Sequence, residues 1–175
     1  MKRMKRLCAL PALVLSLCLA ALPTQAIELG QSAPEVELPG ASVAHLSDLR
    51  GKLVYVDFWA SWCGPCKQSF PWMNEMQKKY AARGFQVLAI NLDAKRGDAD
   101  GFLAWNPASF ALAFDPRGES ARRFGVRAMP TSVLIGADGK LLYLHQGFRN
   151  EERAQLEAQI AAALNSSSPL VSQKN

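Results

Sequence analysis

The sequence predicts an α/β fold in which two strands of one sheet run parallel and are joined by a helix. Residues 53–58 and 85–91 are nearly continuous apolar runs rich in β-branched and aromatic side chains, a composition typical of strands covered on both faces. Between these runs, residues recur at helical spacing at Cys66, Phe70, Met73, Gln77 and Tyr80. Because a strand, a helix and a second strand normally form a crossover unit, we expect the two strands to pair in parallel.

The C-terminal part of the chain predicts a β-hairpin and a last helix. Two β-like segments, 131–135 and 141–145, flank the turn sequence Gly136-Ala137-Asp138-Gly139. The last helix is expected to begin at Asn150, a favourable N-cap residue, and to carry its apolar residues on one face, at Leu156, Ile160 and Leu164. An antiparallel hairpin beside a parallel pair makes the expected sheet a mixed one.

Shorter elements complete one predicted domain, which spans residues 27–164. Residues 27–50 are interrupted by prolines and a glycine and predict an irregular N-terminal β extension. An inserted helix-strand segment is expected within residues 94–124, with a short helix at 97–106, a strand at 110–114 and another short helix at 118–124. The polar, serine-rich residues 165–175 predict a flexible tail.

The first 26 residues have the pattern of a secretory signal peptide. Four cations lie within residues 1–6, an apolar run follows from Leu7 to Leu22, and small residues precede Ile27. The run has 16 residues, which is shorter than the roughly 20 that span a bilayer. We therefore predict a signal peptide at 1–26, cleaved after Ala26, and export to the periplasm. An uncleaved membrane anchor is the alternative.

The charge balance gives no support for a nucleic-acid-binding protein. The chain has 20 Lys and Arg against 15 Asp and Glu, but four of the basic residues and none of the acidic ones lie in residues 1–26. The mature chain keeps 16 against 15, so the excess positive charge belongs to the targeting signal. The mature length is sufficient for one domain whose core needs no disulfide to hold it.

Only two cysteines remain in the mature chain, Cys63 and Cys66, at the predicted start of a helix. A cysteine at that position meets unpaired backbone N–H groups and the positive end of the helix dipole, which favour its thiolate. Cys63 is so placed and is expected to be exposed, whereas Cys66 lies one turn deeper. With Gly64 and Pro65 between them, the two sulfurs can face each other. The pattern predicts a redox-active disulfide in which Cys63 is the nucleophile and Cys66 the resolving cysteine.

Other interpretations of the cysteine pair have less support. A zinc site needs four ligands, and the mature chain offers no further cysteine and only His45 and His145. A structural disulfide that closes so short a loop adds little stability, since the entropy it removes grows with loop length. A non-enzymatic copper-handling assembly factor, with both sulfurs as soft ligands, stays an alternative. The lack of a nearby histidine or methionine cluster argues against it.

Two segments resemble the active-site motifs of thioredoxins. Residues 56–67, VDFWASWCGPCK, are similar to the redox-active segment, and Met129-Pro130-Thr131 is similar to the cis-proline segment. Residues 27–50 and 94–124 resemble the exported, TlpA/ResA-like branch, which serves cytochrome c maturation and oxidase assembly. The resemblance covers residues 33–164 and implies a thioredoxin fold, a central mixed β-sheet flanked by helices, with Pro130 in the cis form beside the cysteines.

The resemblance also implies roles for residues around the pair. Asp57, a carboxylate inside an apolar run, matches the buried catalytic acid that relays the proton of the resolving cysteine. The lysine that thioredoxins place near this acid is matched here by Ala89, so the proton path is expected to differ. Trp62 is implied to be a flat contact surface for the substrate. Residues 129–131 are implied to bind an extended substrate segment through the backbone of Met129.

The sequence therefore predicts a periplasmic thiol:disulfide oxidoreductase that uses neither a dissociable cofactor nor a metal. The dipeptide Gly64-Pro65 is that of thioredoxins and contains no histidine to stabilise a thiolate, so we expect a reductant. A disulfide-introducing oxidant is the alternative. The expected partners are exported proteins with cysteine pairs and a membrane electron donor, because the periplasm is kept oxidising. The protein itself is predicted to be a monomer that binds no nucleic acid.

Overall fold

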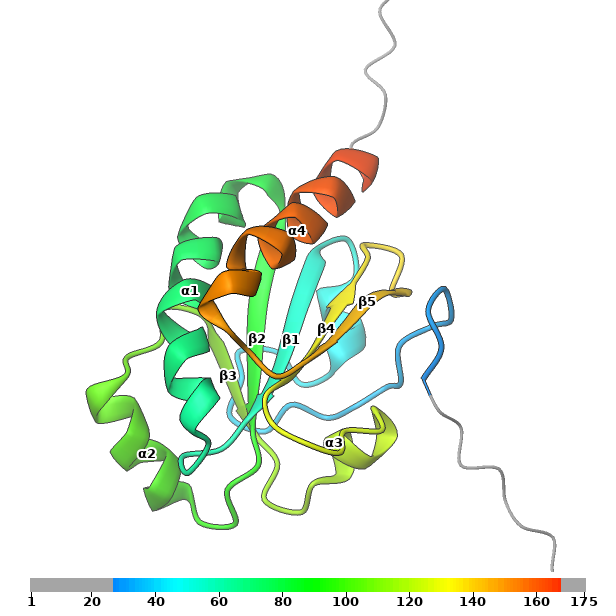
Figure 1. Cartoon of the computed structure of the whole chain (residues 1–175). Coiled ribbons are helices and arrows are strands. Elements are labelled where there is room, and N and C mark those ends of the chain that lie inside the picture. The colour runs from blue at the N-terminus through cyan, green and yellow to red at the C-terminus, as the bar shows by residue number, and fades with distance from the viewer. Residues whose placement is uncertain (1–26, 168–175) are drawn as a thin grey trace, which may run out of the picture.

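The computed structural model describes residues 27–167, which form a five-stranded sheet with helices packed against it (Figure 1). The strands are β1 (Leu53–Trp59), β2 (Phe85–Asn91), β3 (Ala111–Phe114), β4 (Thr131–Ile135) and β5 (Leu141–Gln146). Their order across the sheet is β3-β2-β1-β4-β5. β2 pairs in parallel with both β1 and β3, and β4 pairs antiparallel with both β1 and β5. The predicted mixed sheet and parallel crossover are confirmed.

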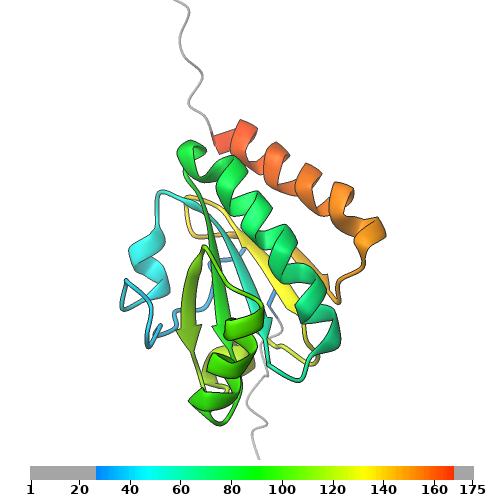
Figure 2. The ribbon, with the colours of Figure 1, turned by 90° about the vertical axis from the view of Figure 1, so that its left-hand side faces the viewer.

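The described residues contain four α-helices: α1 (Gly64–Tyr80), α2 (Arg96–Trp105), α3 (Glu119–Arg123) and α4 (Arg153–Ser167). α1 and α4 lie side by side over one face of the sheet (Figure 2). Side chains from α1, α2 and α4 share one hydrophobic core with that face, and α3 and the N-terminal segment contribute to a second core on the other face. The inserted segment has the predicted order of helix, strand and helix, as α2, β3 and α3.

β1 is the central strand of the sheet. Its side chains are covered on both faces, and all of its residues are buried. Tyr55 and Trp59 belong to the core beneath α1, whereas Val56 and Phe58 belong to the opposite core. By the same alternation Asp57 lies on the α1 side, with 1% of its surface exposed. The strand thus carries a carboxylate into the core that borders the start of α1.

A tight turn at a glycine follows the end of α1. A short 3-10 turn at Ala81–Arg83 continues from the helix, and Gly84 then adopts a φ of 81° in the left-handed region. Glycine reaches this conformation without the steric cost of a Cβ. The chain can therefore reverse into β2 within a few residues. Of the five residues that recur at helical spacing in the sequence, four are buried: Cys66, Phe70, Met73 and Tyr80.

The start and end of the last helix differ from the prediction. Asn150 is not its N-cap, because residues 150–152 form a separate 3-10 turn and α4 begins at Arg153. The helix continues to Ser167, so residues 165–167 belong to the domain and not to the predicted tail. Asn165 Oδ1 accepts a hydrogen bond of 2.8 Å from Arg83, which ties the last turn to the end of α1. The rest of the predicted tail, 168–175, lies outside the described residues.

The N-terminal segment is less regular than a β extension. Within residues 27–50 the described β pairing consists of isolated bridges, from Ser32 to Lys140 and from Glu37 to His45, followed by a 3-10 helix at Leu46–Leu49. Prolines and a left-handed glycine interrupt the pairing, since proline lacks the N–H that a ladder needs. The predicted signal peptide lies outside the described residues. In residues 27–167 no helix is long and apolar enough to cross a membrane.

Candidate active site

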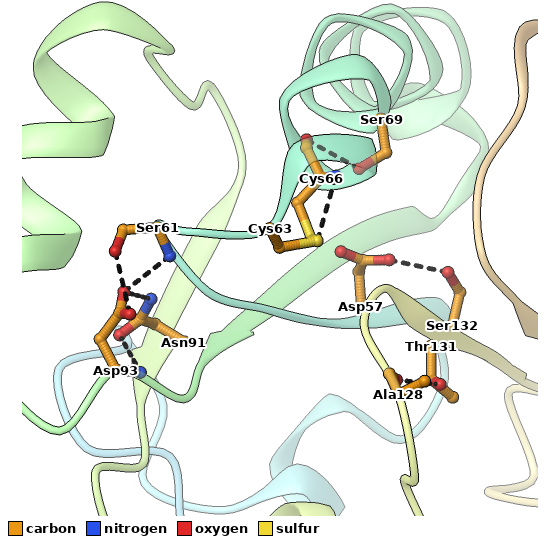
Figure 3. The surroundings of a disulfide bond; sticks show 10 residues. All are labelled: Asp57, Ser61, Cys63, Cys66, Ser69, Asn91, Asp93, Ala128, Thr131 and Ser132. Carbon is orange, nitrogen blue, oxygen red and sulfur yellow. Dashed lines mark hydrogen bonds between the residues drawn. A yellow bond between two sulfur atoms is a disulfide. The ribbon is translucent and has the colours of Figure 1, made fainter.

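The two mature cysteines form a disulfide at the first turn of α1, with their Cα atoms 5.3 Å apart (Figure 3). Cys63 is the N-cap of the helix, and its Sγ accepts a hydrogen bond of 3.2 Å from the N–H of Cys66. Pro65 lies in the first turn of the helix. Backbone N–H groups in that turn have no acceptor within the helix, so the helix loses no hydrogen bond because proline lacks one. The local sequence therefore places both sulfurs where the helix N-terminus stabilises negative charge.

The prediction that Cys63 is exposed is wrong for this disulfide form. Cys63 has 3% of its surface exposed and Cys66 has none. The sulfur of Cys63 is bonded to the fully buried Cys66, which keeps it from solvent in this form. The adjacent Trp62 is 73% exposed and presents its ring to solvent.

Asp57 lies close to the disulfide on the neighbouring strand. Its Oδ1 accepts a hydrogen bond of 2.7 Å from the hydroxyl of Ser132, and Figure 3 shows its other oxygen directed toward the sulfurs. Burial raises the pKa of Asp57 from 3.8 to about 7, against the opposing effect of the Ser132 hydrogen bond. Ala89 pairs with Asp57 on β2 and brings no charge to the carboxyl, as the sequence predicted. The acid is thus poised to exchange a proton near neutral pH.

The cis-proline segment lies at the start of β4, and the peptide bond between Met129 and Pro130 is cis, as the resemblance implied. The carbonyl of Pro130 accepts from Gly147 at 2.8 Å, and the Thr131 hydroxyl donates to the carbonyl of Ala128 at 2.7 Å. Thr131 is itself buried, so it shapes the loop from within. Among residues 27–167 no hydrogen bond occupies the backbone of Met129, which leaves that backbone able to pair with another chain.

The comparisons with known proteins agree with this geometry. The family model described as Redoxin matches residues 28–160. The thiol-disulfide oxidoreductase ResA of Bacillus thuringiensis is 33% identical over 132 residues, covering 74% of this chain and 76% of that protein. The chain belongs to the redoxin family. ResA of Geobacillus thermodenitrificans is 30% identical to this redoxin over 164 residues, covering 87% of this chain and 94% of its own.

Solved structures share the fold of this redoxin. A Chlorobium tepidum protein with the provisional name thiol:disulfide interchange protein DsbE is 57% identical, with a TM-score of 0.76 over 79% of this chain and 99% of its own. A Bacteroides thetaiotaomicron protein provisionally named a protein disulfide isomerase is 27% identical, with a TM-score of 0.71 over 79% of this chain and 91% of its own. This redoxin is a thiol:disulfide oxidoreductase of the ResA/TlpA-like type with a thioredoxin fold.

Sequence reasoning missed a second buried acid beside the active-site loop of this redoxin. Asp93 accepts hydrogen bonds from the Ser61 N–H at 2.9 Å, the Ser61 hydroxyl at 3.0 Å and the Asn91 side chain at 2.7 Å. The cluster, visible in Figure 3, fastens the loop before Cys63 to the end of β2. The signal that could have found it is Asn91-Leu92-Asp93 at the end of an apolar strand, where polar side chains gather beside a site.

The histidines have ordinary structural surroundings. His145 Nε2 lies 3.2 Å from Glu152 Oε2, and the backbone N–H of His45 donates to Asp48 at 2.9 Å. In the described part of the chain no group of three or more His, Cys, Asp or Glu side chains is arranged to hold a metal ion. The disulfide between Cys63 and Cys66 at a helix N-terminus is the feature that supports redox chemistry.

Proposed function

We propose that this redoxin is exported to the periplasm and there reduces disulfides in other exported proteins. The signal-peptide pattern of residues 1–26 supports export. The similarity to ResA proteins supports a client that contains a cysteine pair. In each cycle the reduced pair, Cys63 and Cys66, transfers two electrons to one client disulfide.

The buried carboxyl of Asp57 is the observation that carries the reductant proposal. One of its oxygens is directed toward the sulfurs (Figure 3), and the side chain is 1% exposed. When ionised, a carboxylate in such a place repels a thiolate, and the weak screening of the interior strengthens the repulsion. Less stabilisation of the thiolate means less stabilisation of the reduced pair, so the pair gives up its electrons more readily.

The first step is attack of the Cys63 thiolate on one sulfur of the client disulfide. A bond forms between Cys63 Sγ and that sulfur, the client's own S–S bond breaks, and its other sulfur leaves as a thiolate. Because the two sulfurs are bonded to each other in the disulfide form, the pair must be reduced before Cys63 can attack. The unoccupied backbone of Met129 pairs with the client segment beside the reacting sulfur.

The second step releases the client and restores the disulfide seen in the structure. Cys66 loses its proton to Asp57, attacks Cys63 Sγ, and displaces the second client sulfur as a thiolate. The client leaves with two reduced sulfurs, and the enzyme keeps the Cys63–Cys66 bond. An acid with a pKa of about 7 suits this transfer, because it is partly ionised at neutral pH and can both take and return a proton.

Clients and electron supply follow from the oxidising compartment. A reductant in the periplasm is re-reduced through a membrane electron donor, since no soluble thiol pool maintains it there. We assign the clients to cytochrome c or oxidase maturation because of the resemblance to the ResA/TlpA-like branch. We further expect the enzyme to act as a monomer.

The redox midpoint of the purified mature protein tests the direction of transfer. Equilibration with dithiothreitol and glutathione buffers should give a value near that of thioredoxin, about −270 mV. A midpoint near that of the oxidant DsbA, about −120 mV, would support the alternative in which the protein introduces disulfides. The Asp57→Asn variant is the informative comparison, since removal of the charge should make the couple more oxidising.

A titration with copper(I) separates both redox functions from the copper-handling alternative. The two sulfurs of the reduced pair are soft ligands that could hold this ion. A stoichiometric, tight complex together with absent disulfide exchange would favour metal handling. Rapid exchange with a model disulfide, and copper binding no tighter than that of dithiothreitol, would favour the oxidoreductase.

A further inference from the structure

A groove runs from the active-site loop to α2, and we name it the α2 groove. It has a volume of about 420 Å³ and is lined by Ser61, Lys67, Gly101, Phe102, Trp105 and Asn106. Trp105 is 88% exposed, the largest value among the exposed large hydrophobic residues of the described chain. An indole so fully in water costs hydration free energy that contact with a partner can recover.

Three of the residues that line the α2 groove are held in place by contacts on their inner side. Ser61 is fastened to Asp93 by two hydrogen bonds of 2.9 and 3.0 Å. Phe102 packs against Trp59 with ring centroids 4.7 Å apart. The Asn106 side chain donates to the carbonyl of Phe102 at 3.0 Å and closes the end of α2. This part of the groove is preformed, so binding need not order these three side chains.

Two of the residues that line the groove flank the cysteine pair in the chain. Ser61 lies two residues before Cys63, and Lys67 directly follows Cys66 on α1. The exposed ring of Trp62 stands between Ser61 and Cys63 in the same loop. A residue of the client a few positions from the sulfur joined to Cys63 can therefore reach the end of the groove at Ser61.

The lining selects a particular kind of side chain. Phe102 and Trp105 supply aromatic surface, and Lys67 is the one charged residue among the six lining residues. Within residues 27–167 no carboxylate forms an ion pair with Lys67. The groove thus offers apolar area together with an unneutralised cation, and both attract a partner that brings an aromatic ring and an acid.

We propose that the α2 groove is a client-docking subsite that takes an aromatic side chain flanked by a carboxylate, a few residues from the client cysteine under attack. The subsite adds specificity to the oxidoreductase activity and does not depend on the direction of electron flow. Binding energy gained there favours clients of this composition over other disulfides. The enzyme should react with small disulfides that do not reach the groove at the same rate whether or not the groove is intact.

Two synthetic peptides and one small disulfide test the proposal. Each peptide carries one cysteine as a mixed disulfide with thionitrobenzoate, and a glycine stands on each side of that cysteine. In the first peptide each glycine is followed outward by Phe and Glu. In the second peptide Ala and Gln replace Phe and Glu. The protein is the reduced Cys66→Ser variant, in which attack by Cys63 on the peptide sulfur releases the thionitrobenzoate thiolate and then stops. We expect a preference of about tenfold for the Phe-Glu peptide, equivalent to about 1.4 kcal/mol.

Two further substitutions remove the groove in different ways. Trp105→Ala takes away the aromatic wall, and Gly101→Leu fills the space, since no atom lies within 4 Å of a Cβ built at Gly101. Replacing a helical glycine also improves helix propensity, so the second variant is expected to fold. Both should abolish the preference while the rate with dithiobis(nitrobenzoate) stays unchanged. Leu29→Ala, which trims another exposed apolar side chain, is the matched control.

The outcomes separate the occupants of the groove. Loss of the preference in both groove variants, and its retention in Leu29→Ala, would support the client subsite. An equal rate for the two peptides, or a preference that survives both groove substitutions, would overturn it. A dimer in sedimentation that becomes a monomer with Trp105→Ala would assign the groove to a second copy of this chain and also overturn the proposal. The redox midpoint enters none of these readouts, so they stand apart from the reductant assignment.

Discussion

The hydroxyl of Ser132 donates a hydrogen bond of 2.7 Å to Oδ1 of Asp57, while Oδ2 of the same carboxyl has no hydrogen-bond partner among the described residues. A buried polar atom without a partner costs free energy, and such atoms concentrate where chemistry needs them. Here the unpartnered oxygen is the one directed toward the disulfide (Figure 3). In the proposed mechanism Ser132 is a positioning residue that leaves one carboxyl oxygen free to take the Cys66 proton.

Ser132→Ala should raise the pKa of Asp57 above its value of about 7, because the hydroxyl stabilises the ionised carboxylate. The pH at which the resolving step reaches half its maximal rate should rise with it, by about one unit for a lost hydrogen bond of 1–2 kcal/mol. Stopped-flow release of a mixed disulfide at Cys63, measured over a range of pH, reports this midpoint. Ser132→Thr keeps the hydroxyl and should restore it. A midpoint that is identical in all three proteins would show that Ser132 does not position the acid.

Asp57→Asn should stabilise the oxidised protein at alkaline pH. The folded-state pKa of Asp57, about 7, lies above its ordinary value of 3.8, so the folded protein binds this proton more tightly than the unfolded chain does. The contribution of the group to stability is complete below about pH 4 and is lost as the pH rises toward 7. Since the variant has no such loss, its advantage above neutral pH should be on the order of 4 kcal/mol.

Urea unfolding of the oxidised proteins measures this effect at about pH 4 and about pH 8, the two ends of the titration. The wild-type protein should lose stability between them, and Asp57→Asn should change much less. Parallel curves for the two proteins would mean that the carboxyl is not held in its neutral form by burial. Cys63 and Cys66 do not titrate while they are joined, so they add nothing to the comparison.

The two cysteines should differ in function. Cys63→Ser should abolish disulfide exchange, because the attacking sulfur is lost. Cys66→Ser should leave Cys63 able to attack but unable to be released, so a mixed disulfide with the client persists. Non-reducing electrophoresis and mass spectrometry of the trapped species check both outcomes. Faster alkylation of Cys66 than of Cys63 in the reduced protein would reverse these roles.

Asp93→Ala should destabilise the fold more than an exposed acid does. The change removes the acceptor of the Ser61 N–H, the Ser61 hydroxyl and the Asn91 amide, all at or near a buried position. We expect a loss of about 2–4 kcal/mol in the free energy of unfolding, measured with urea. Asp100→Ala is the control, because its ion pair with Arg96 is exposed and worth less than about 1 kcal/mol. Equal losses in the two variants would mean that the Asp93 cluster contributes little.

Export should leave a mature protein that begins near Ile27. Mass spectrometry of protein recovered from the periplasm checks the cleavage site, and a variant without residues 1–26 should stay in the cytoplasm. A full-length chain starting at Met1 in the membrane fraction would instead support the uncleaved anchor. The expectation rests on the charge and hydrophobicity of the first 26 residues.

The redox pair and the main elements of the fold were determined by the sequence itself. Cys63, Gly64, Pro65 and Cys66 are neighbours in the chain, so their chemistry depends on a single helix start. The strands and the hairpin follow from short-range periodicity. Asp57 could be recognised as an unusual carboxylate because its neighbours in the strand are uniformly apolar. Local signals of this kind need no knowledge of distant contacts.

Other features of the site were decided only by the tertiary structure. Ser132 meets Asp57 across 75 positions of sequence, and Asp93 meets Ser61 across 32, through strand pairing whose register the sequence does not state. The burial of Cys63 goes with its bond to the deeper Cys66. The α2 groove arises where residues of the loop, α1 and α2 converge. Contacts between residues far apart in sequence depend on how elements pack, and a one-residue change of register would send each strand side chain to the opposite face.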